Sequence, residues 1–118
     1  MKSINTLFHF ECSEDHGYVI VLDSPITFSS YGYQYIIEKG YKSNGMSVPR
    51  MLWGIISPPY DPRTIIPSII HDWMYDTHIL SRKQSDAWYR DELIENEYPA
   101  WKAYAVYYAI RIFGSSHW

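Results

Sequence analysis

Apolar and aromatic residues alternate with polar turn residues over the first forty positions of the chain. Short runs rich in β-branched and aromatic side chains are separated by Gly, Ser, Asp and Pro, a pattern typical of strands joined by tight turns. Because the runs follow one another closely, the pattern predicts a small antiparallel sheet within residues 1–40. The runs cover residues 7–10, 18–22, 26–28 and 33–37.

Residues 41–66 have no regular apolar period and hold four of the seven prolines. This composition predicts a long, ordered loop, and such loops in a compact domain often carry function. Two aromatic residues of the loop, Trp53 and Tyr60, are expected to line a cleft or to contact a partner.

Residues 67–114 predict three helices. The first covers residues 67–76, where Pro67 suits a first helical turn and apolar residues recur at spacings of three and four. The second follows a capping box formed by Ser81 and Gln84, and it extends to about Asn96.

Pro99 and Gly114 bracket the third helix. Its only charged residues are Lys102 and Arg111, so it is expected to be buried on most of its circumference. The two halves of the chain together predict an α+β fold in one domain of residues 1–118, with an N-terminal antiparallel sheet, a long loop and three C-terminal helices.

The chain has 118 residues, a formal charge of −3 and one cysteine, Cys12. A single cysteine excludes an intrachain disulfide, and the absence of a Lys/Arg run argues against binding of nucleic acid. Neither a signal peptide nor a transmembrane stretch is expected. Aromatic residues make up 18% of the chain, and their helical spacing in the second half favours a compact core over a sticky surface.

The densest cluster of chemically active side chains lies on the first two predicted helices. His71 and Tyr75 share one helical face, and Asp72 lies on an adjacent face. Asp86 shares the face of Tyr89 on the next helix, so its carboxylate is expected to point toward the core. An imidazole can take a proton from water when a carboxylate fixes its tautomer, and Asp72 could hold calcium or magnesium. No nucleotide or organic cofactor is expected, since no phosphate-binding loop is present.

Each of these residues also has a structural interpretation. His71 could be a satisfied core or helix-cap histidine. Asp86 lies four residues from both Arg82 and Arg90, a spacing that fits an exposed ion-pair ladder equally well. Asp72 could be ordinary surface charge.

Several short motifs occur in a fixed order along the chain: residues 43–50, residues 69–76, Ser81-Arg82 with Asp86, residues 101–103, and residues 109–114. In this order they resemble a family of small proteins of unknown function that are encoded mostly by bacteriophages and prophages. The resemblance covers residues 26 to 114; it implies a phage origin and no particular activity. The chain has Asn44 where that family usually has Asp, and Asn can still bind a cation through its carbonyl oxygen.

The His-Asp-x-x-Tyr segment of His71, Asp72 and Tyr75 is similar to the catalytic helix of secreted phospholipases of the A-two type. In that family the His is the general base for a water, the adjoining Asp binds calcium, and an Asp on the next antiparallel helix orients the His. The resemblance implies these roles for His71, Asp72 and Asp86. It is local, because the cysteines of those enzymes are absent and Asn44-Gly45 is the nearest substitute for their calcium loop.

These observations favour a phage-encoded, metal-assisted hydrolase with His71 as the general base, Asp86 as its orienting partner and Asp72 as a metal ligand. A positive side chain at the mouth of such a site would stabilise developing negative charge. Residues expected at the substrate or at the mouth of the site are Asn44, Arg50, Tyr75 and Arg82.

The alternative is a non-catalytic protein of virion or tail assembly, or a host-interaction factor, in which the His–Asp pair is a buried network that fixes helix docking. A separation of His71 and Asp86 beyond about 6 Å, or a pair sealed from solvent with no cleft, favours this structural role. A third interpretation, attachment to a membrane surface by the last helix, predicts an exposed apolar stripe. The expected location is the host cytoplasm or the phage particle, and the expected partner is an unidentified substrate or a phage or host protein.

Overall fold

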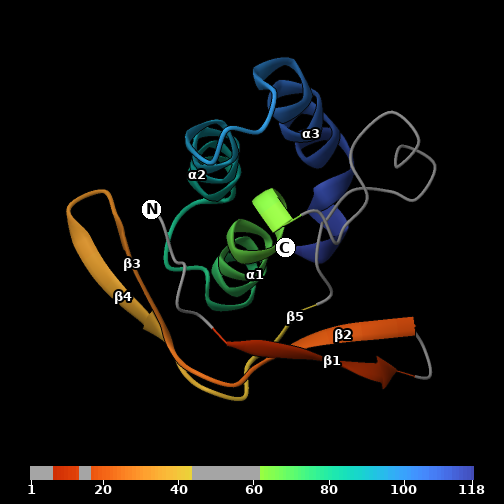
Figure 1. The fold of residues 1–118 in the computed structure, drawn as a ribbon. Coiled ribbons are helices and arrows are strands. Elements are labelled where there is room, and N and C mark those ends of the chain that lie inside the picture. The colour runs from red at the N-terminus through yellow and green to blue at the C-terminus, as the bar shows by residue number, and fades with distance from the viewer. Residues whose placement is uncertain (1–6, 14–16, 44–61) are drawn as a thin grey trace.

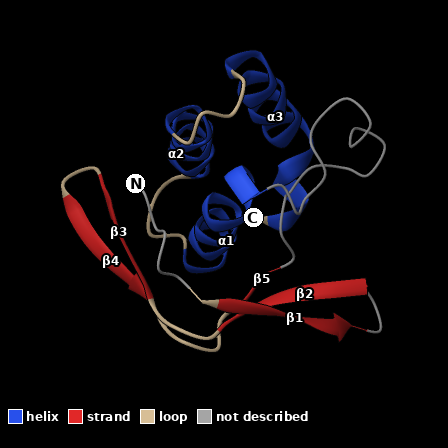
Figure 2. Cartoon of the chain, viewed as in Figure 1, coloured by secondary structure: helices blue, strands red, loops and turns tan. Residues whose placement is uncertain are grey.

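Strands precede helices along the chain, so the predicted α+β fold is confirmed in the computed structural model, which describes residues 7–13, 17–43 and 62–118 (Figure 1). Figure 2 shows the strands on one side of α1 and the other two helices on its other side. The elements are β1 (Phe8–Ser13), β2 (Gly17–Leu22), β3 (Ile26–Ser30), β4 (Tyr33–Ile37), β5 (Lys42–Ser43), α1 (Pro62–Thr77), α2 (Arg82–Glu95), α3 (Ala100–Phe113) and a 3₁₀ turn (Gly114–His117).

The antiparallel strands are divided between two sheets. β2 pairs with β1 along one edge, where Phe8 lies opposite Leu22, and with β5 along the other edge. Because both edges of β2 are occupied, β3 pairs with β4 in a separate hairpin. β5 consists of two residues, too few for apolar alternation to indicate a strand.

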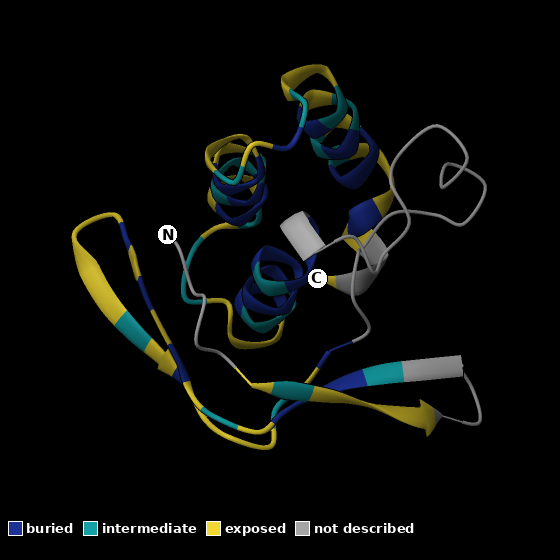
Figure 3. Cartoon of the chain, viewed as in Figure 1, coloured by how far each residue is buried: buried dark blue, intermediate teal, exposed yellow. Residues whose placement is uncertain are grey.

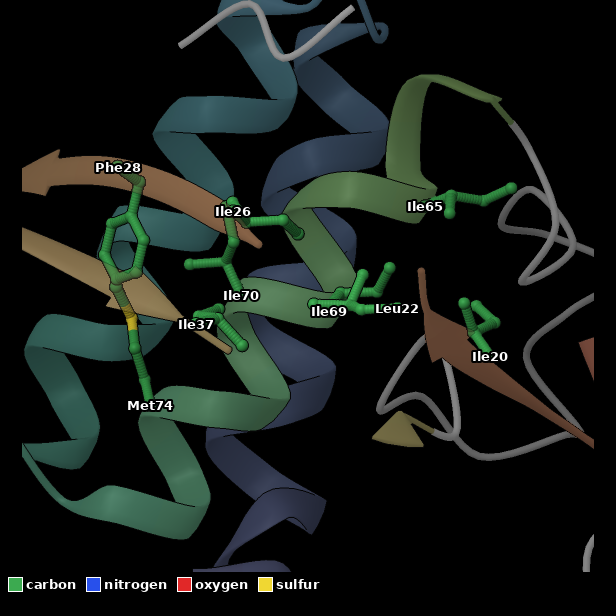
Figure 4. Close-up of a cluster of buried hydrophobic side chains, with 9 residues drawn as sticks. All are labelled: Ile20, Leu22, Ile26, Phe28, Ile37, Ile65, Ile69, Ile70 and Met74. Atoms are coloured by element: carbon green, nitrogen blue, oxygen red, sulfur yellow. The ribbon is translucent and has the colours of Figure 1, made fainter. Parts of the chain in front are cut away.

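Apolar side chains from the strands pack against one face of α1 and form a hydrophobic cluster (Figure 4). Buried and exposed positions alternate along β3, so Ile26 and Phe28 face inward. On α1 the buried residues Ile65 and Ile69 lie four positions apart, as do Ile70 and Met74, on the side that meets the strands. Burial of each such aliphatic side chain contributes roughly 1.5–3 kcal/mol to the free energy of unfolding, and this cluster fixes α1 against the sheets.

Helix α1 begins at Pro62, five residues earlier than predicted. Pro67 therefore lies inside the helix and not in its first turn. There it lacks the N–H that would bond the carbonyl four residues earlier. The first-turn preference of proline applies equally to Pro62, and the apolar face continues back to Ile65, so burial of that face outweighs the lost hydrogen bond.

The predicted loop of residues 41–66 is shorter than expected at both ends. Lys42–Ser43 forms β5, and α1 includes the last five residues of the predicted loop. Trp53 and Tyr60, expected to line a cleft or meet a partner, lie outside the described residues.

Helix α2 begins where the capping box predicts. The Ser81 hydroxyl accepts a hydrogen bond from the backbone N–H of Gln84, and the Gln84 side chain accepts one from the backbone N–H of Ser81. Asn96 follows the last helical residue, as predicted. The start of α2 at this capping box fixes the direction in which α2 leaves α1, and Asp86 thereby lies against His71 of α1.

Replacing Ser81 with Ala is expected to lower the free energy of unfolding by about 1 kcal/mol, because one N–H of the first turn loses its acceptor. Urea unfolding of the wild type and the variant measures the difference. Lys83→Ala, an exposed change on the same helical turn, is the control, with an expected change within about 0.5 kcal/mol. Equal losses in the two variants would contradict a capping role.

Helix α3 has the predicted ends at Pro99 and Gly114, but its burial differs from the prediction. Ala103, Val106 and Ile110 are buried, whereas a line of large side chains on the opposite face is exposed. The physical reason is that, among the described elements, α3 makes extensive contact only with α2 and with the 3₁₀ turn that follows it, so one side of α3 enters the core. Within the described residues, no helix has the length and apolar character needed to cross a membrane.

Candidate functional site

His71 on α1 and Asp86 on α2 form a hydrogen-bonded pair. The Nε2 atom of His71 lies 2.8 Å from the Oδ1 atom of Asp86. The exposed fractions of the two side chains are 1% and 0%. The short distance is the one that the catalytic interpretation requires, whereas the burial of both side chains favours the structural interpretation.

The Asp86 carboxylate, on α2, accepts hydrogen bonds from side chains of α1 and α3. Its Oδ1 atom also accepts the Tyr75 hydroxyl at 2.6 Å, and its Oδ2 atom accepts Nη1 of Arg111, on α3, at 3.0 Å. Burial by itself raises the pKa of Asp86. The hydrogen bonds from His71 and Tyr75, the charge of His71 and the hydrogen bond from Arg111 outweigh burial and hold the pKa below its usual value. The carboxylate is therefore ionised at neutral pH.

This arrangement excludes the exposed ion-pair ladder. Asp86 is fully buried, and Arg90, the residue four positions on, pairs with Asp91 at 2.9 Å. Arg82 lies 3.8 Å from the Asp86 carboxylate. The inward orientation of Asp86 that the sequence predicts is confirmed.

The ionised carboxylate fixes the tautomer of His71. A carboxylate can only accept, so Nε2 of the neutral imidazole carries the hydrogen and Nδ1 carries the lone pair. The ring stacks on Tyr89, with centroids 4.6 Å apart and an interplanar angle of 22°, and it also contacts Tyr75. The Tyr89 hydroxyl lies 2.7 Å from the Ser68 hydroxyl. These contacts hold the imidazole plane, and Nδ1 is the nitrogen that can accept a proton.

The two tyrosines keep their protons at physiological pH. Burial raises the pKa of Tyr75, and its hydrogen bond to Asp86 raises it further. Burial likewise raises the pKa of Tyr89. Tyr75 thus acts as a constant donor to Asp86 and does not take part in proton transfer.

The other two acids of α1 face β5 and the residue before it. The hydroxyl of Ser43 donates to Asp72 at 2.7 Å, and the hydroxyl of Tyr41 donates to Asp76 at 2.6 Å. Burial and the Asp76 hydrogen bond raise the pKa of Tyr41. Asp72 therefore lies in a defined orientation at the junction of α1 and the sheet, one residue along the helix from His71.

The proposed metal site is only partly within the described residues. In residues 7–13, 17–43 and 62–118, no three His, Cys, Asp or Glu side chains are grouped so that they could hold a metal ion. Asp72 therefore belongs to no three-residue ligand group within these described ranges. Asn44 and Arg50, predicted at the mouth of the site, lie outside the described residues.

Arg82 lies beside Asp86 and also donates hydrogen bonds to α3. Its Nη1 and Nη2 atoms donate to the backbone carbonyls of Ile110 and Arg111, both at 3.2 Å. These carbonyls belong to the last turn of α3, and the Ile110 carbonyl also accepts the backbone N–H of Gly114. Arg82 therefore joins α2 to the C-terminal end of α3, and it brings Arg111 toward Asp86.

The sequence did not identify Arg111 as part of the site. The available signal was that an otherwise apolar helix carries one arginine in its last turn. Such a residue either supports the helix end or reaches a buried acid, and Arg111 reaches Asp86. Ser43 was missed too, since nothing in its local pattern shows that β5 passes beside α1.

Comparison with known proteins gives a family and distant relatives. Residues 20–110 match the model of a family described as "Protein of unknown function (DUF1353)". The uncharacterized protein y4jT of Sinorhizobium fredii is 28% identical over 105 residues, which are 89% of this chain and 29% of that protein. The uncharacterized protein y4iH of the same bacterium is 28% identical over 100 residues, 85% of this chain and 38% of that protein.

The chain therefore spans well under half the length of these curated relatives. No solved structure matches it. The membership in a family of unknown function that the motifs indicate is confirmed, and the phage origin stays a prediction.

Proposed function

The chain belongs to the DUF1353 family, whose description assigns no activity, and we propose from the His71–Asp86 geometry that it is a hydrolase. The observation that carries the proposal is the 2.8 Å hydrogen bond between Nε2 of His71 and an ionised carboxylate. It leaves Nδ1 as the basic nitrogen of a ring that is held between two tyrosines.

In the proposed reaction, Nδ1 of His71 takes a proton from a water molecule while the water oxygen attacks an acyl carbon or a phosphorus atom. Asp86 stabilises the imidazolium that forms, because its negative charge lies against Nε2–H. The imidazolium then returns the proton to the leaving group as the bond to it breaks. Tyr75 and Arg111 are positioning residues in this scheme, since each donates a hydrogen bond to Asp86 and neither supplies the atom that takes the proton.

Access to Nδ1 requires a local opening of the chain. His71 is 1% exposed. The side chains that cover the ring must therefore move before water and substrate can reach Nδ1. We therefore expect the hydrolase to bind substrate with a conformational change around the α1–α2 pair.

Asp72 is proposed as a ligand of calcium or magnesium, the hard cations that carboxylate oxygens bind. The support is its position beside His71 and the orientation that Ser43 gives it. The described residues contain no group of three such ligands, so no step of the reaction is assigned to the cation. A phage origin, with action in the host cytoplasm or in the phage particle, is part of the same proposal and rests on the motif resemblance.

An assay of the whole chain on ester, phosphodiester and peptidoglycan substrates, with and without calcium or magnesium, tests the proposal. Turnover of one substrate class that depends on His71 supports it. If added calcium or magnesium raises the hydrolysis rate of the wild type but not that of Asp72→Asn, the cation is assigned to Asp72. The residual rate of Asp72→Asn should still depend on His71. No turnover of any of the three classes would contradict the hydrolase.

The burial of the pair favours a second candidate, a non-catalytic protein of virion or tail assembly or of host interaction. All the oxygens of Asp86 have partners within the helices, as expected for a network that fixes how α1, α2 and α3 dock. In this case substitutions of His71 lower stability and no substrate is turned over.

A further inference from the structure

The outer face of α3 carries a line of exposed aromatic and aliphatic side chains. Trp101, Tyr104, Tyr108 and Ile112 follow one another at spacings of three and four, so they lie on one helical face. Their exposed fractions are 63%, 45%, 59% and 68%. We call these four residues the α3 stripe. Figure 3 shows both buried and exposed stretches along this helix.

The α3 stripe is distinct from the face of α3 that packs in the core. The opposite side of the helix supplies the buried residues Ala103, Val106 and Ile110, which pack on α2. The two faces differ in chemistry as well, because the buried side is small and aliphatic while the stripe carries Trp and Tyr. Exposed rows of large apolar residues on a folded domain mark interaction sites.

The net charge of residues 98–118, which include α3, differs in sign from that of residues 1–97. Residues 98–118 contain Lys102 and Arg111 and no acidic residue, whereas residues 1–97 contain thirteen acidic and eight basic residues. Lys102 flanks the α3 stripe on one side of the helix, whereas Arg111, on the other side, is paired with Asp86. A face of this kind is complementary to a negatively charged surface.

The basic groups lie against the aromatic rings. The Lys102 ammonium is 5.6 Å from the ring centroid of Trp101, and the Arg90 guanidinium of α2 is 5.1 Å from that of Tyr104. Arg90 is neutralised in part by Asp91, so Lys102 is the main cation beside the stripe. Lysine stems of this kind cover apolar surface while the ammonium stays in water.

We propose that the α3 stripe binds the surface of bilayers that contain anionic phospholipids. Trp and Tyr prefer the interface between lipid headgroups and acyl chains, and Lys beside them pairs with lipid phosphate. With 14 residues α3 is about 21 Å long, so it lies in the plane of the interface and does not cross it. A second copy of the chain is a poorer occupant, because two α3 faces in contact would bring like charges together.

Flotation of the whole chain with phosphatidylcholine vesicles, with and without phosphatidylglycerol, tests this proposal. The wild type should bind the vesicles that contain phosphatidylglycerol more tightly, and added salt should weaken the binding. The double variant Tyr108→Ser/Ile112→Ser should bind about tenfold more weakly or worse, because it removes apolar area from the stripe.

A matched control is available on β4. Tyr33 and Ile36 are exposed at 69% and 51%, so Tyr33→Ser/Ile36→Ser removes the same two side-chain types from another surface and should keep full binding. No vesicle binding by the wild type, equal loss in the two double variants, or equal binding with and without phosphatidylglycerol would overturn the proposal. Binding to polyglutamate in place of vesicles would also overturn it, in favour of an acidic protein partner. A dimer mass in light scattering that only the α3 variant loses would overturn it in favour of a second copy.

Discussion

Replacing His71 with Asn should lower the hydrolysis rate by about 100- to 10,000-fold, the usual contribution of a general base. Asn can still donate to the Asp86 carboxylate, but it has no nitrogen that takes a proton. The loss should fall on kcat/KM for the substrate class that the wild type turns over, measured at one pH for both proteins.

The control for this variant is His78→Asn, the same change at an exposed histidine just beyond α1. It should leave the rate unchanged. Hydrolysis that persists in His71→Asn at the wild-type rate would remove His71 as the base. Urea unfolding of both variants separates loss of chemistry from loss of the fold, because a folded but inactive His71→Asn protein cannot be explained by docking of the helices alone.

Replacing Asp86 with Ala should lower the free energy of unfolding by about 3–5 kcal/mol, the cost of removing one partner from a buried ion pair. The change leaves the Arg111 guanidinium and the Tyr75 hydroxyl without their acceptor. It also removes the contact that joins all three helices. Chemical denaturation measures the loss, and Asp91→Ala, an exposed acid on the same helix, should change stability by no more than about 0.5 kcal/mol.

Asp86→Asn provides a second variant, because it keeps the volume of the side chain and removes only its charge. A stability equal to that of the wild type in both Asp86 variants would show that the network does not hold the helices together. Loss of stability in Asp86→Ala with a smaller loss in Asp86→Asn would agree with a charged hydrogen-bond centre.

The contribution of Asp86 should depend on pH in a defined direction. Its pKa in the folded protein lies below the value of about 3.9 for an unfolded chain, so the folded state binds fewer protons in acid. The stabilisation is therefore complete above that unfolded pKa and is lost as the pH falls through the folded pKa. The stability difference between wild type and Asp86→Asn should narrow over this acidic range, and a constant difference would contradict the shifted pKa.

The helical half was predictable because its signals are local. The capping box of Ser81 and Gln84 and the bracket of Pro99 and Gly114 act within one turn, and the structure has these ends. The inward orientation of Asp86 followed from its place on the helix, and the distance to His71 confirms the pairing. The start of α1 was predicted too late, since two prolines have the same local preference and only tertiary packing distinguishes them.

The features that were not predicted depend on contacts between distant segments. β5 exists because a two-residue segment meets β2, and it also brings Ser43 to Asp72. Arg111 reaches Asp86 only because α3 folds back against α2. The exposure of the α3 stripe has the same origin, because an apolar helix is buried all round only when neighbours cover every side.

The most direct measurement is the ¹⁵N NMR spectrum of the His71 imidazole, recorded at a pH high enough to leave the ring neutral. The structure predicts a hydrogen on Nε2 and a lone pair on Nδ1, because Asp86 accepts from Nε2. The same spectrum of Asp86→Ala should show a mixture of tautomers. A hydrogen found on Nδ1 in the wild type would contradict the proposed role, since that nitrogen could not then take a proton from water.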